Sequence, residues 1–260
     1  MSETTTTRHA VVTGGARGIG YAIAETLLRQ GHSITLMGRS EAPLKKACQQ
    51  LQSLGSVGYV TGDISQREAV EQAFQQAVQA RGTISILVNN AGQATSERFD
   101  RLTEADWHQM IAVNLTGTYH CIQVALAGMF EQQWGRIINV ASTAGLVGYS
   151  YVAAYCAAKH GVIGLTRSLA LECAKKGVTV NAVCPGYTET ELIHEAIDNI
   201  IKKTGMSEDD ARAQLAKNNP QGKLVQPQQV AEVVGWLCQP GADAVNGQSI
   251  PVDGGEVMVG

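Results

Sequence analysis

Residues 9–31, HAVVTGGARGIGYAIAETLLRQG, carry the pattern from which the architecture of the whole chain can be inferred. The apolar run HAVVT is typical of a buried strand, and AIAETLLRQG has the apolar spacing of an amphipathic helix. Gly14-x-x-x-Gly18-x-Gly20 lies between them. A glycine-rich turn at this place lets a dinucleotide pyrophosphate approach the N–H groups of the helix N-terminus. The segment therefore predicts a βα unit with a dinucleotide site, although the motif alone also fits a glycine turn without a ligand.

The same alternation of short apolar runs and amphipathic stretches continues along the chain. After His9–Thr13, strands are predicted at Ser33–Met37, Val57–Thr61, Ile84–Asn89, Arg136–Ala141, Thr179–Cys184 and Ser249–Val252. The run ISILVNN is almost entirely apolar at its centre, as expected for a strand covered on both faces. We therefore expect one doubly wound α/β domain of the Rossmann type over residues 1–260, with about seven parallel strands.

Two segments depart from this alternation. Residues 189–223 form a polar insert with a helical spacing of isoleucines, which predicts a small helical lid over the substrate. The first seven residues, MSETTTT, are polar, and we expect them to be disordered.

The composition excludes several classes of protein. The chain has 260 residues, is 44% hydrophobic and has a net charge of −3, so it can bury a core but offers no basic surface for nucleic acid. No stretch approaches the roughly 20 apolar residues of a membrane span, and the first residues lack the apolar core of a secretory signal. Its six cysteines form no C-x-x-C pair, and its six histidines lack metal-ligand spacing. These features predict a cytoplasmic protein with no metal, nucleic-acid or membrane partner.

The type of nucleotide is indicated at the end of the second predicted strand. An acidic residue there would hold the adenosine ribose and repel a 2′-phosphate, but the sequence is Met37-Gly38-Arg39-Ser40, with no carboxylate before Glu41. Arg39 and Arg17 are candidate donors to a 2′-phosphate, which favours NADP(H). NAD(H) stays open, because both arginines fit solvated surface charges and Glu41 can turn inward.

A second group of candidate residues follows the fifth predicted strand. Ser142 comes first, and Tyr155 and Lys159 follow, four residues apart and so on one face of a helix. Lowering a phenol pKa from about 10 to about 7 takes about 4 kcal/mol, which a lysine ammonium and a cationic nicotinamide can supply together. Tyr155 would then act as general acid in reduction and as base in oxidation, and Ser142 would hold the substrate oxygen. Taken alone, Tyr-x-x-x-Lys also fits a surface tyrosine on a helix.

Considered together, these motifs resemble the short-chain dehydrogenase/reductase family from Thr13 to Gly255. The matching pieces are TGGARGIG at 13–20, GDIS at 62–65, NNAG at 89–92, VNLTG at 113–117, IINVAS at 137–142, Tyr155 with Lys159, NAVCPG at 181–186 and VDGG at 252–255. The resemblance implies a catalytic tetrad of Asn114, Ser142, Tyr155 and Lys159. In it Lys159 also holds the nicotinamide ribose, and Asn114 anchors a water that passes protons to Lys159. It further implies a homotetramer.

The resemblance also implies a set of cofactor contacts. Asp63 and Ile64 would face the adenine, and Pro185, Gly186, Thr188 and Thr190 would lie at the nicotinamide end. The remaining contacts would come from Thr13, Gly14, Arg17, Gly18, Ile19, Gly20 and Arg39, from Asn90, Ala91 and Gly92, and from Tyr155 and Lys159.

Within the family, the chain looks similar to 3-hydroxybutyrate dehydrogenases, acetoacetyl-CoA reductases and other 3-hydroxyacyl dehydrogenases. Gln93 stands where 3-hydroxybutyrate dehydrogenases place a carboxylate-binding glutamine, but Tyr149 and Tyr151 occupy the segment in which they carry a lysine. The resemblance thus favours a 3-oxoacyl thioester such as an acyl-CoA over the free acid. The substrate residues would be Gln93, Ser142, Tyr149 and Tyr155.

Two alternatives remain. One is an NAD-dependent dehydrogenase that oxidises 3-hydroxybutyrate or another small secondary alcohol. The other is a non-catalytic regulator that senses the nucleotide, although a pure binding protein has no use for Tyr155 as an acid.

Overall fold

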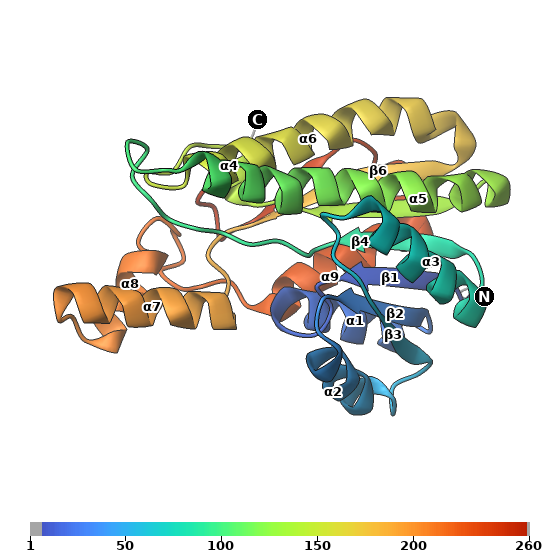
Figure 1. The fold of residues 1–260 in the computed structure, drawn as a ribbon, viewed down its shortest axis with the longest axis horizontal. Helices are drawn as coiled ribbons and strands as arrows, with labels where there is room; N and C mark the ends of the chain where they lie inside the picture. Colours follow the sequence, from blue (N-terminus) through green and yellow to red (C-terminus); the bar gives the residue numbers. More distant parts are fainter. Residues whose placement is uncertain (1–6, 259–260) are drawn as a thin grey trace.

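The seven strands of the chain form one parallel sheet in the computed structural model, which describes residues 7–258. Their order is β3-β2-β1-β4-β5-β6-β7, and every pairing is parallel (Figure 1). Their bounds are β1 His9–Thr13, β2 Ser33–Gly38, β3 Val57–Thr61, β4 Ile84–Asn89, β5 Gly135–Val140, β6 Val178–Pro185 and β7 Ser249–Val252. The doubly wound architecture is confirmed, and each predicted strand lies within one residue of its observed bounds. The predicted disorder of residues 1–6 lies outside the described residues, and Thr7 is exposed and outside regular structure.

Helices cover both faces of the sheet because the buried strands are apolar on both sides. One face packs against α1 (Gly18–Arg29), α2 (Glu41–Leu51) and α9 (Pro227–Leu237), through a cluster that includes Val12, Leu36 and Ile86. The other face packs against α3 (Arg67–Arg81), α5 (Gly117–Gln132) and α6 (Ala153–Cys173), through a cluster that includes Val11, Met37 and Leu87. The alternation of Val11 and Val12 between the two clusters shows directly how one strand serves both layers.

The strand order changes direction between β1 and β4. The chain runs outward from β1 to β3, then returns to the other side of β1 and continues from β4 to β7. In open α/β sheets the crevice at such a reversal, beyond the carboxyl ends of the strands, is where ligands bind. The segments after β1, β4, β5 and β6 all begin at this edge, and they contain nearly all the residues singled out from the sequence.

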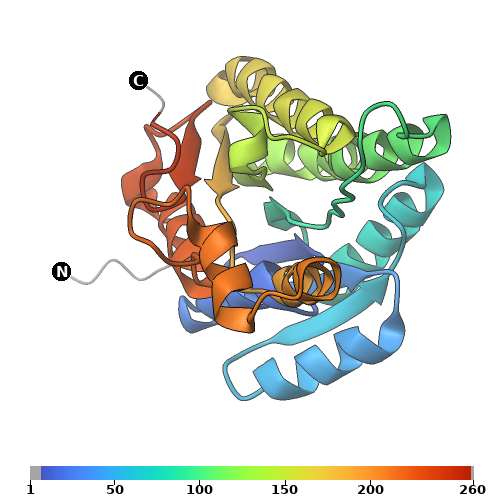
Figure 2. The ribbon, with the colours of Figure 1, turned by 90° about the vertical axis from the view of Figure 1, so that its left-hand side faces the viewer.

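The insert at 189–223 forms two helices, α7 (Glu191–Thr204) and α8 (Glu208–Ala216). They project from the body of the molecule at the end where the strands finish (Figures 1 and 2). Ile193 and Ile197 of α7 pack with Ala211 and Ala216 of α8 and with Leu224, in a core separate from the two main clusters. The isoleucine stripe therefore stabilises this helical hairpin, as the sequence predicts.

Two further observations concern the described residues as a whole. No helix between residues 7 and 258 has the length and the apolar character to cross a bilayer. The six cysteines are free thiols, four of them buried, and the same residues contain no cluster of three potential metal ligands.

Candidate active site

The glycine-rich loop after β1 is fixed to the end of β4 by hydrogen bonds. The Thr13 hydroxyl accepts from the backbone N–H groups of Asn90 and Ala91, both at 3.0 Å. The Asn90 side chain donates to the carbonyl oxygens of Thr13 at 3.0 Å and Gly14 at 3.2 Å. Thr13 and Asn90 thus tie the glycine loop to the end of β4. These hydrogen bonds fix the shape of the chain where the strand order reverses.

Gly14 and Gly20 are required in the loop for different reasons. Gly14 has a φ of +65°, a conformation that L side chains rarely adopt. A Cβ on Gly20 would lie 2.4 Å from the carbonyl oxygen of Gly14, so α1 could not pack this closely against the loop. Arg17, at the N-cap of α1, makes no side-chain cap, which leaves the first N–H groups of the helix free for an anion. This arrangement fits the pyrophosphate of a dinucleotide.

Three charged residues near the predicted adenosine end, Glu41, Arg39 and Arg17, differ in their partners. Glu41 accepts a hydrogen bond from the Tyr59 hydroxyl at 2.9 Å, so its carboxylate is directed toward β3. Arg39 is exposed just after β2, and no carboxylate of the described residues pairs with it. Arg17 forms a 2.7 Å ion pair with Glu191, the first residue of α7. The glycine loop and the α7–α8 hairpin are therefore in direct contact.

Asp63 and Ile64 lie after β3. One oxygen of Asp63 accepts from the backbone N–H of Ser65 at 2.9 Å and from its hydroxyl at 2.8 Å, which makes a local turn. Ile64 is buried, and its side chain packs so closely on Gly117 that a Cβ there would lie 2.7 Å away. The side chain of Ile64 therefore belongs to the core.

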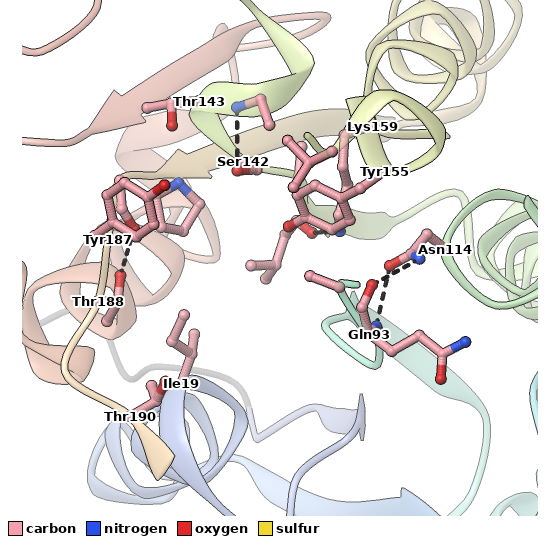
Figure 3. A pocket seen from close by; sticks show the side chains of 18 of the residues that line it. Ile19, Gln93, Asn114, Ser142, Thr143, Tyr155, Lys159, Tyr187, Thr188 and Thr190 are labelled. Atoms are coloured by element: carbon pink, nitrogen blue, oxygen red, sulfur yellow. Dashed lines mark hydrogen bonds between the residues drawn. The ribbon is translucent and has the colours of Figure 1, made fainter. Parts of the chain in front are cut away.

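Ser142, Tyr155 and Lys159 converge on one cavity, as Figure 3 shows. Ser142 follows β5, and its hydroxyl oxygen accepts from the N–H of Ala144 at 3.1 Å. Tyr155 and Lys159 lie in the first two turns of α6, and the Lys159 ammonium is 5.6 Å from the Tyr155 ring centroid. Lys159 donates to the carbonyl oxygen of Val140 at 2.9 Å, which positions its long side chain under the ring.

Burial dominates the electrostatics of this group. It raises the pKa of Tyr155 to about 12, against a smaller lowering by the hydrogen bond with Ser142. It lowers the pKa of Lys159 to about 8. Both shifts have the same cause, because each charged form loses water in the interior. Tyr155 is therefore protonated at neutral pH, which is the form that can donate a proton.

Asn114 lies in a five-residue π-helical turn, Ala112–Thr116, between α4 (Glu104–Ile111) and α5. Such turns are frequent at functional sites. Its amide donates to the carbonyl oxygen of Gln93 at 2.9 Å and accepts from the N–H of Gln93 at 3.2 Å. A Cβ on Gly92 would lie 2.7 Å from the Asn114 side-chain oxygen and 3.8 Å from the Lys159 nitrogen. Gly92 therefore lies between these two side chains, with no room for a side chain of its own.

The residues predicted for the nicotinamide end form the wall of the cavity that faces Tyr155 and Asn114 (Figure 3). Pro185, Gly186, Thr188 and Thr190 all line the cavity, and the Thr188 hydroxyl donates to the carbonyl oxygen of Gly186 at 2.9 Å. The cavity has a volume of about 260 Å³ and extends from Ile19 of α1 to Tyr155. It is therefore continuous from the helix N-terminus to the candidate proton donor.

Not all of the residues considered for substrate binding face the cavity. Tyr149 lines the cavity, whereas Tyr151 is 62% exposed and does not. The backbone of Gln93 supports Asn114, and its side chain extends away from Tyr187 and Ser142 in Figure 3. Several residues that line the cavity were not predicted from the sequence, although they lie in or near the motifs or in the 189–223 insert: Ala94, Val140, Ala141, Thr143, Ala144, Val152, Tyr187 and Ile193.

Comparison with known proteins agrees with this geometry. The family model described as short chain dehydrogenase matches residues 8–200. A D-beta-hydroxybutyrate dehydrogenase of Cupriavidus necator is 38% identical over 95% of this chain and 97% of its own length. A 3-oxoacyl-[acyl-carrier-protein] reductase, FabG, of Vibrio harveyi is 37% identical over 96% of this chain and 97% of its own.

Among solved structures, a variant of actinorhodin polyketide ketoreductase with NADPH superimposes with a TM-score of 0.93. It is 35% identical, and the match covers 97% of this chain and 98% of that one. Because the family model and relatives of this identity span most of the sequence, the chain belongs to the short-chain dehydrogenase family and is an oxidoreductase of CH–OH groups.

Proposed function

We propose that this enzyme reduces the keto group of a 3-oxoacyl thioester with NADPH and catalyses the reverse oxidation with NADP⁺. The observation that carries the proposal is the single cavity that joins the N-terminus of α1 to Ser142, Tyr155 and Lys159. When bound, the nicotinamide supplies or accepts the hydride. The protein residues must then bind the nucleotide, orient the carbonyl and move one proton.

Tyr155 and Ser142 are assigned to the substrate oxygen. Tyr155 donates its proton to that oxygen in reduction and accepts it back in oxidation. Ser142 donates a hydrogen bond to the same oxygen while negative charge develops on it. Support for this pairing comes from their common position at the cavity and from the effect of Ser142, which lowers the pKa of Tyr155 against the larger rise caused by burial.

Lys159 and Asn114 are assigned to positions behind the reacting atoms. The Lys159 ammonium lowers the energy of the phenolate form of Tyr155 and holds the nicotinamide ribose. The side chain of Asn114 is 1% exposed and fully engaged with Gln93 and Met110, which supports a positioning role for it. The predicted water relay from Asn114 to Lys159 remains part of the proposal.

The rest of the nucleotide is assigned to the loops at the reversal of the sheet. The pyrophosphate is held by the loop from Thr13 to Gly20, the adenine lies near Asp63, and the ribose side is bounded by the segment from Asn90 to Gly92. Pro185, Gly186, Thr188 and Thr190 hold the nicotinamide end. The free N–H groups of α1 and the fixed geometry of Thr13 and Asn90 support this arrangement.

We assign the preference for NADP(H) to Arg39. Replacing it with aspartate is expected to shift the ratio of kcat/KM for NADPH over NADH by at least about tenfold toward NADH, because a guanidinium partner of the 2′-phosphate becomes a repelling charge. Steady-state kinetics with both nucleotides measures this ratio. Arg101→Asp makes the same charge change on an exposed residue before α4 and serves as the matched control. An unchanged ratio in R39D would show that Arg39 does not bind the phosphate.

The choice of a thioester is tested by direct turnover. Acetoacetyl-CoA, free acetoacetate and a simple ketone are compared at equal concentration with NADPH and with NADH. Rapid oxidation of NADPH by the thioester alone supports the proposal. Preferential oxidation of NADH by acetoacetate would instead favour a 3-hydroxybutyrate dehydrogenase, which the 38% identity to the Cupriavidus enzyme keeps as the second candidate. Tight nucleotide binding without turnover of any of the three would favour the regulator.

We also propose that α7 and α8 act as a lid over the substrate. Ile193 is 7% exposed and contributes to both the cavity wall and the core of the hairpin. Ile193→Ala is expected to raise KM for the substrate about tenfold, through the loss of apolar contact, and to change the nucleotide Kd less than twofold. Ile200→Ala is the matched control, because Ile200 packs in the hairpin without lining the cavity. Equal KM values in the two variants would place the substrate elsewhere.

A cytoplasmic homotetramer completes the proposal. Leu171 on α6 is 81% exposed and Trp236 on α9 is 46% exposed, and these helices lie on opposite faces of the sheet. Two separate apolar positions suit the two different two-fold contacts of a tetramer with 222 symmetry. The six free thiols support a reducing compartment.

A further inference from the structure

The segment that follows β7 is held in a fixed turn close to the cavity. One oxygen of Asp253 accepts from the N–H of Gly255 at 2.9 Å, and the other accepts from the N–H of Val257 at 2.8 Å. Asp253 is 5% exposed, so these bonds are shielded from water. Glu256 lies between the two anchored N–H groups, and the turn therefore determines where its carboxylate points.

The Glu256 carboxylate stands directly behind the cavity wall. It accepts a hydrogen bond from the Tyr149 hydroxyl at 2.7 Å. A Cβ on Gly186 would lie 3.3 Å from its second oxygen. The rings of Tyr149 and Tyr187 meet edge to face, with centroids 6.4 Å apart, and both residues line the cavity. Three loops, after β5, β6 and β7, thus bring one negative charge to the substrate side of the cavity.

Within the described part of the chain, the cavity wall next to Glu256 offers no cation that would balance a substrate carboxylate. Among the described residues that line it, Lys159 alone has a cationic side chain. The Lys159 ammonium donates to Val140 and lies behind the Tyr155 ring, at the reacting end. The side chain of Gln93, the residue predicted to bind a carboxylate, extends away from Tyr187 in Figure 3.

We infer that Glu256, held by Tyr149, determines substrate specificity by making the cavity reject free 3-oxo acids and accept uncharged 3-oxoacyl esters and thioesters. The carboxylate of a free 3-oxo acid is two bonds from the reacting carbonyl, so it must enter the cavity whose wall the Glu256 carboxylate adjoins through Tyr149 and Gly186. Two negative charges at short range in a partly desolvated site repel each other. In a thioester the same carbon carries no charge. The inference rests on the proposed function for the kind of substrate, but the charge of Glu256 can be tested separately.

Overall identity does not decide between two kinds of substrate that the charge of Glu256 would distinguish. The hydroxybutyrate dehydrogenase and the acyl-carrier-protein reductase are 38% and 37% identical to this chain. By their names, the first acts on a free hydroxy acid and the second on an acyl chain in thioester linkage. A carboxylate at the substrate wall is compatible with the second kind of substrate and opposes the first.

The test is the isosteric substitution Glu256→Gln, which removes the charge and keeps an acceptor for the Tyr149 hydroxyl. The kcat/KM values are measured with NADPH for acetoacetate and for the N-acetylcysteamine thioester of acetoacetate. The substitution is expected to raise the value for acetoacetate about tenfold, as for the loss of one like charge several ångströms away. The value for the thioester should stay within about twofold. Glu172→Gln, an exposed charge change on α6, should alter neither value.

Two further measurements keep the result unambiguous. Tyr149→Phe removes the hydrogen bond but leaves the carboxylate, so it should not improve acetoacetate turnover. Calorimetric titration of the enzyme–NADP⁺ complex with acetoacetate should show about tenfold tighter binding to E256Q than to wild type, even if neither compound is turned over. Equal acetoacetate affinity in both proteins, or equal gains for acid and thioester, would overturn the inference. Tighter acetoacetate binding by E256Q together with no turnover of the thioester would instead overturn the proposed function and leave the role of Glu256 standing.

Discussion

Replacing Tyr155 with phenylalanine is expected to abolish hydride transfer and to leave the affinity for NADP(H) within about threefold of wild type. Burial keeps the pKa of Tyr155 at about 12, so the hydroxyl is protonated at neutral pH and can serve as the acid. Phenylalanine fills the same space in α6 and removes only the oxygen. Because a positioned general acid contributes about 10²–10⁴ in rate, kcat should fall by at least about a hundredfold.

The measurement is kcat from NADPH oxidation, combined with a nucleotide titration by fluorescence. Tyr187→Phe is the matched control, because Tyr187 lines the same cavity and is not assigned to proton transfer. Its kcat should change by less than about threefold. Retention of more than a tenth of wild-type kcat in Y155F would exclude Tyr155 as the proton donor.

The substitution Lys159→Met is expected to eliminate turnover and, in the absence of nucleotide, to make the folded protein more stable at pH 7. Burial lowers the pKa of Lys159 from 10.5 to about 8, so the fold opposes the charged form. One pKa unit corresponds to about 1.4 kcal/mol, which makes this opposition roughly 3 kcal/mol. Loss of the hydrogen bond to Val140 offsets about 1 kcal/mol of it. Methionine has a similar length and no charge to bury, so a net gain of about 2 kcal/mol is expected.

The pH dependence of the free energy of unfolding follows from the pH at which Lys159 loses its proton in the folded and in the unfolded state. Between pH 8 and 10.5 the unfolded chain keeps the Lys159 proton while the folded chain loses it, so the wild-type free energy of unfolding rises through this window. Below pH 8 both states are protonated, and the full cost of burying the charge is present. The stability difference between variant and wild type should therefore be largest at pH 7 and should diminish toward pH 10.5.

Urea unfolding at several pH values measures this difference, and Lys45→Met, at an exposed position on α2, is the control for adding an apolar side chain. A K159M variant less stable than wild type at pH 7 would contradict the account of Lys159 as a buried charge kept for function. Higher stability together with lost turnover is the result expected where a residue is kept for activity although it destabilises the fold.

Much of the fold was predictable because its signals are local. Each strand is a short apolar run whose neighbours along the chain are helical, and alternate residues such as Val11 and Val12 serve opposite faces. A parallel sheet with helices on both sides follows from this repeat. The glycine loop and the pair Tyr155 and Lys159 were found for the same reason, because a turn requires glycine and a helix brings residues four apart onto one face.

The placement of each predicted residue depended on contacts between distant segments. The sequence does not show that Ile64 is buried under Gly117, that Arg17 pairs with Glu191 or that the backbone of Gln93 holds Asn114. Each of these contacts joins two loops or helices whose relative position depends on the packing of the whole sheet.

The pair Tyr149 and Glu256 shows this difference most clearly. The chain order of the motifs predicted the fold class correctly and, without any structure, singled out the candidate reacting residues and the candidate nucleotide end. The two partners of this hydrogen bond are 107 positions apart, and neither lies in a motif that predicts the other. They meet because β5, β6 and β7 are parallel neighbours, so the loops that follow these strands all begin at the same edge of the sheet. Only the tertiary structure placed a carboxylate behind the cavity wall at Tyr149, because this position depends on side chains that packing alone brings within reach of one another.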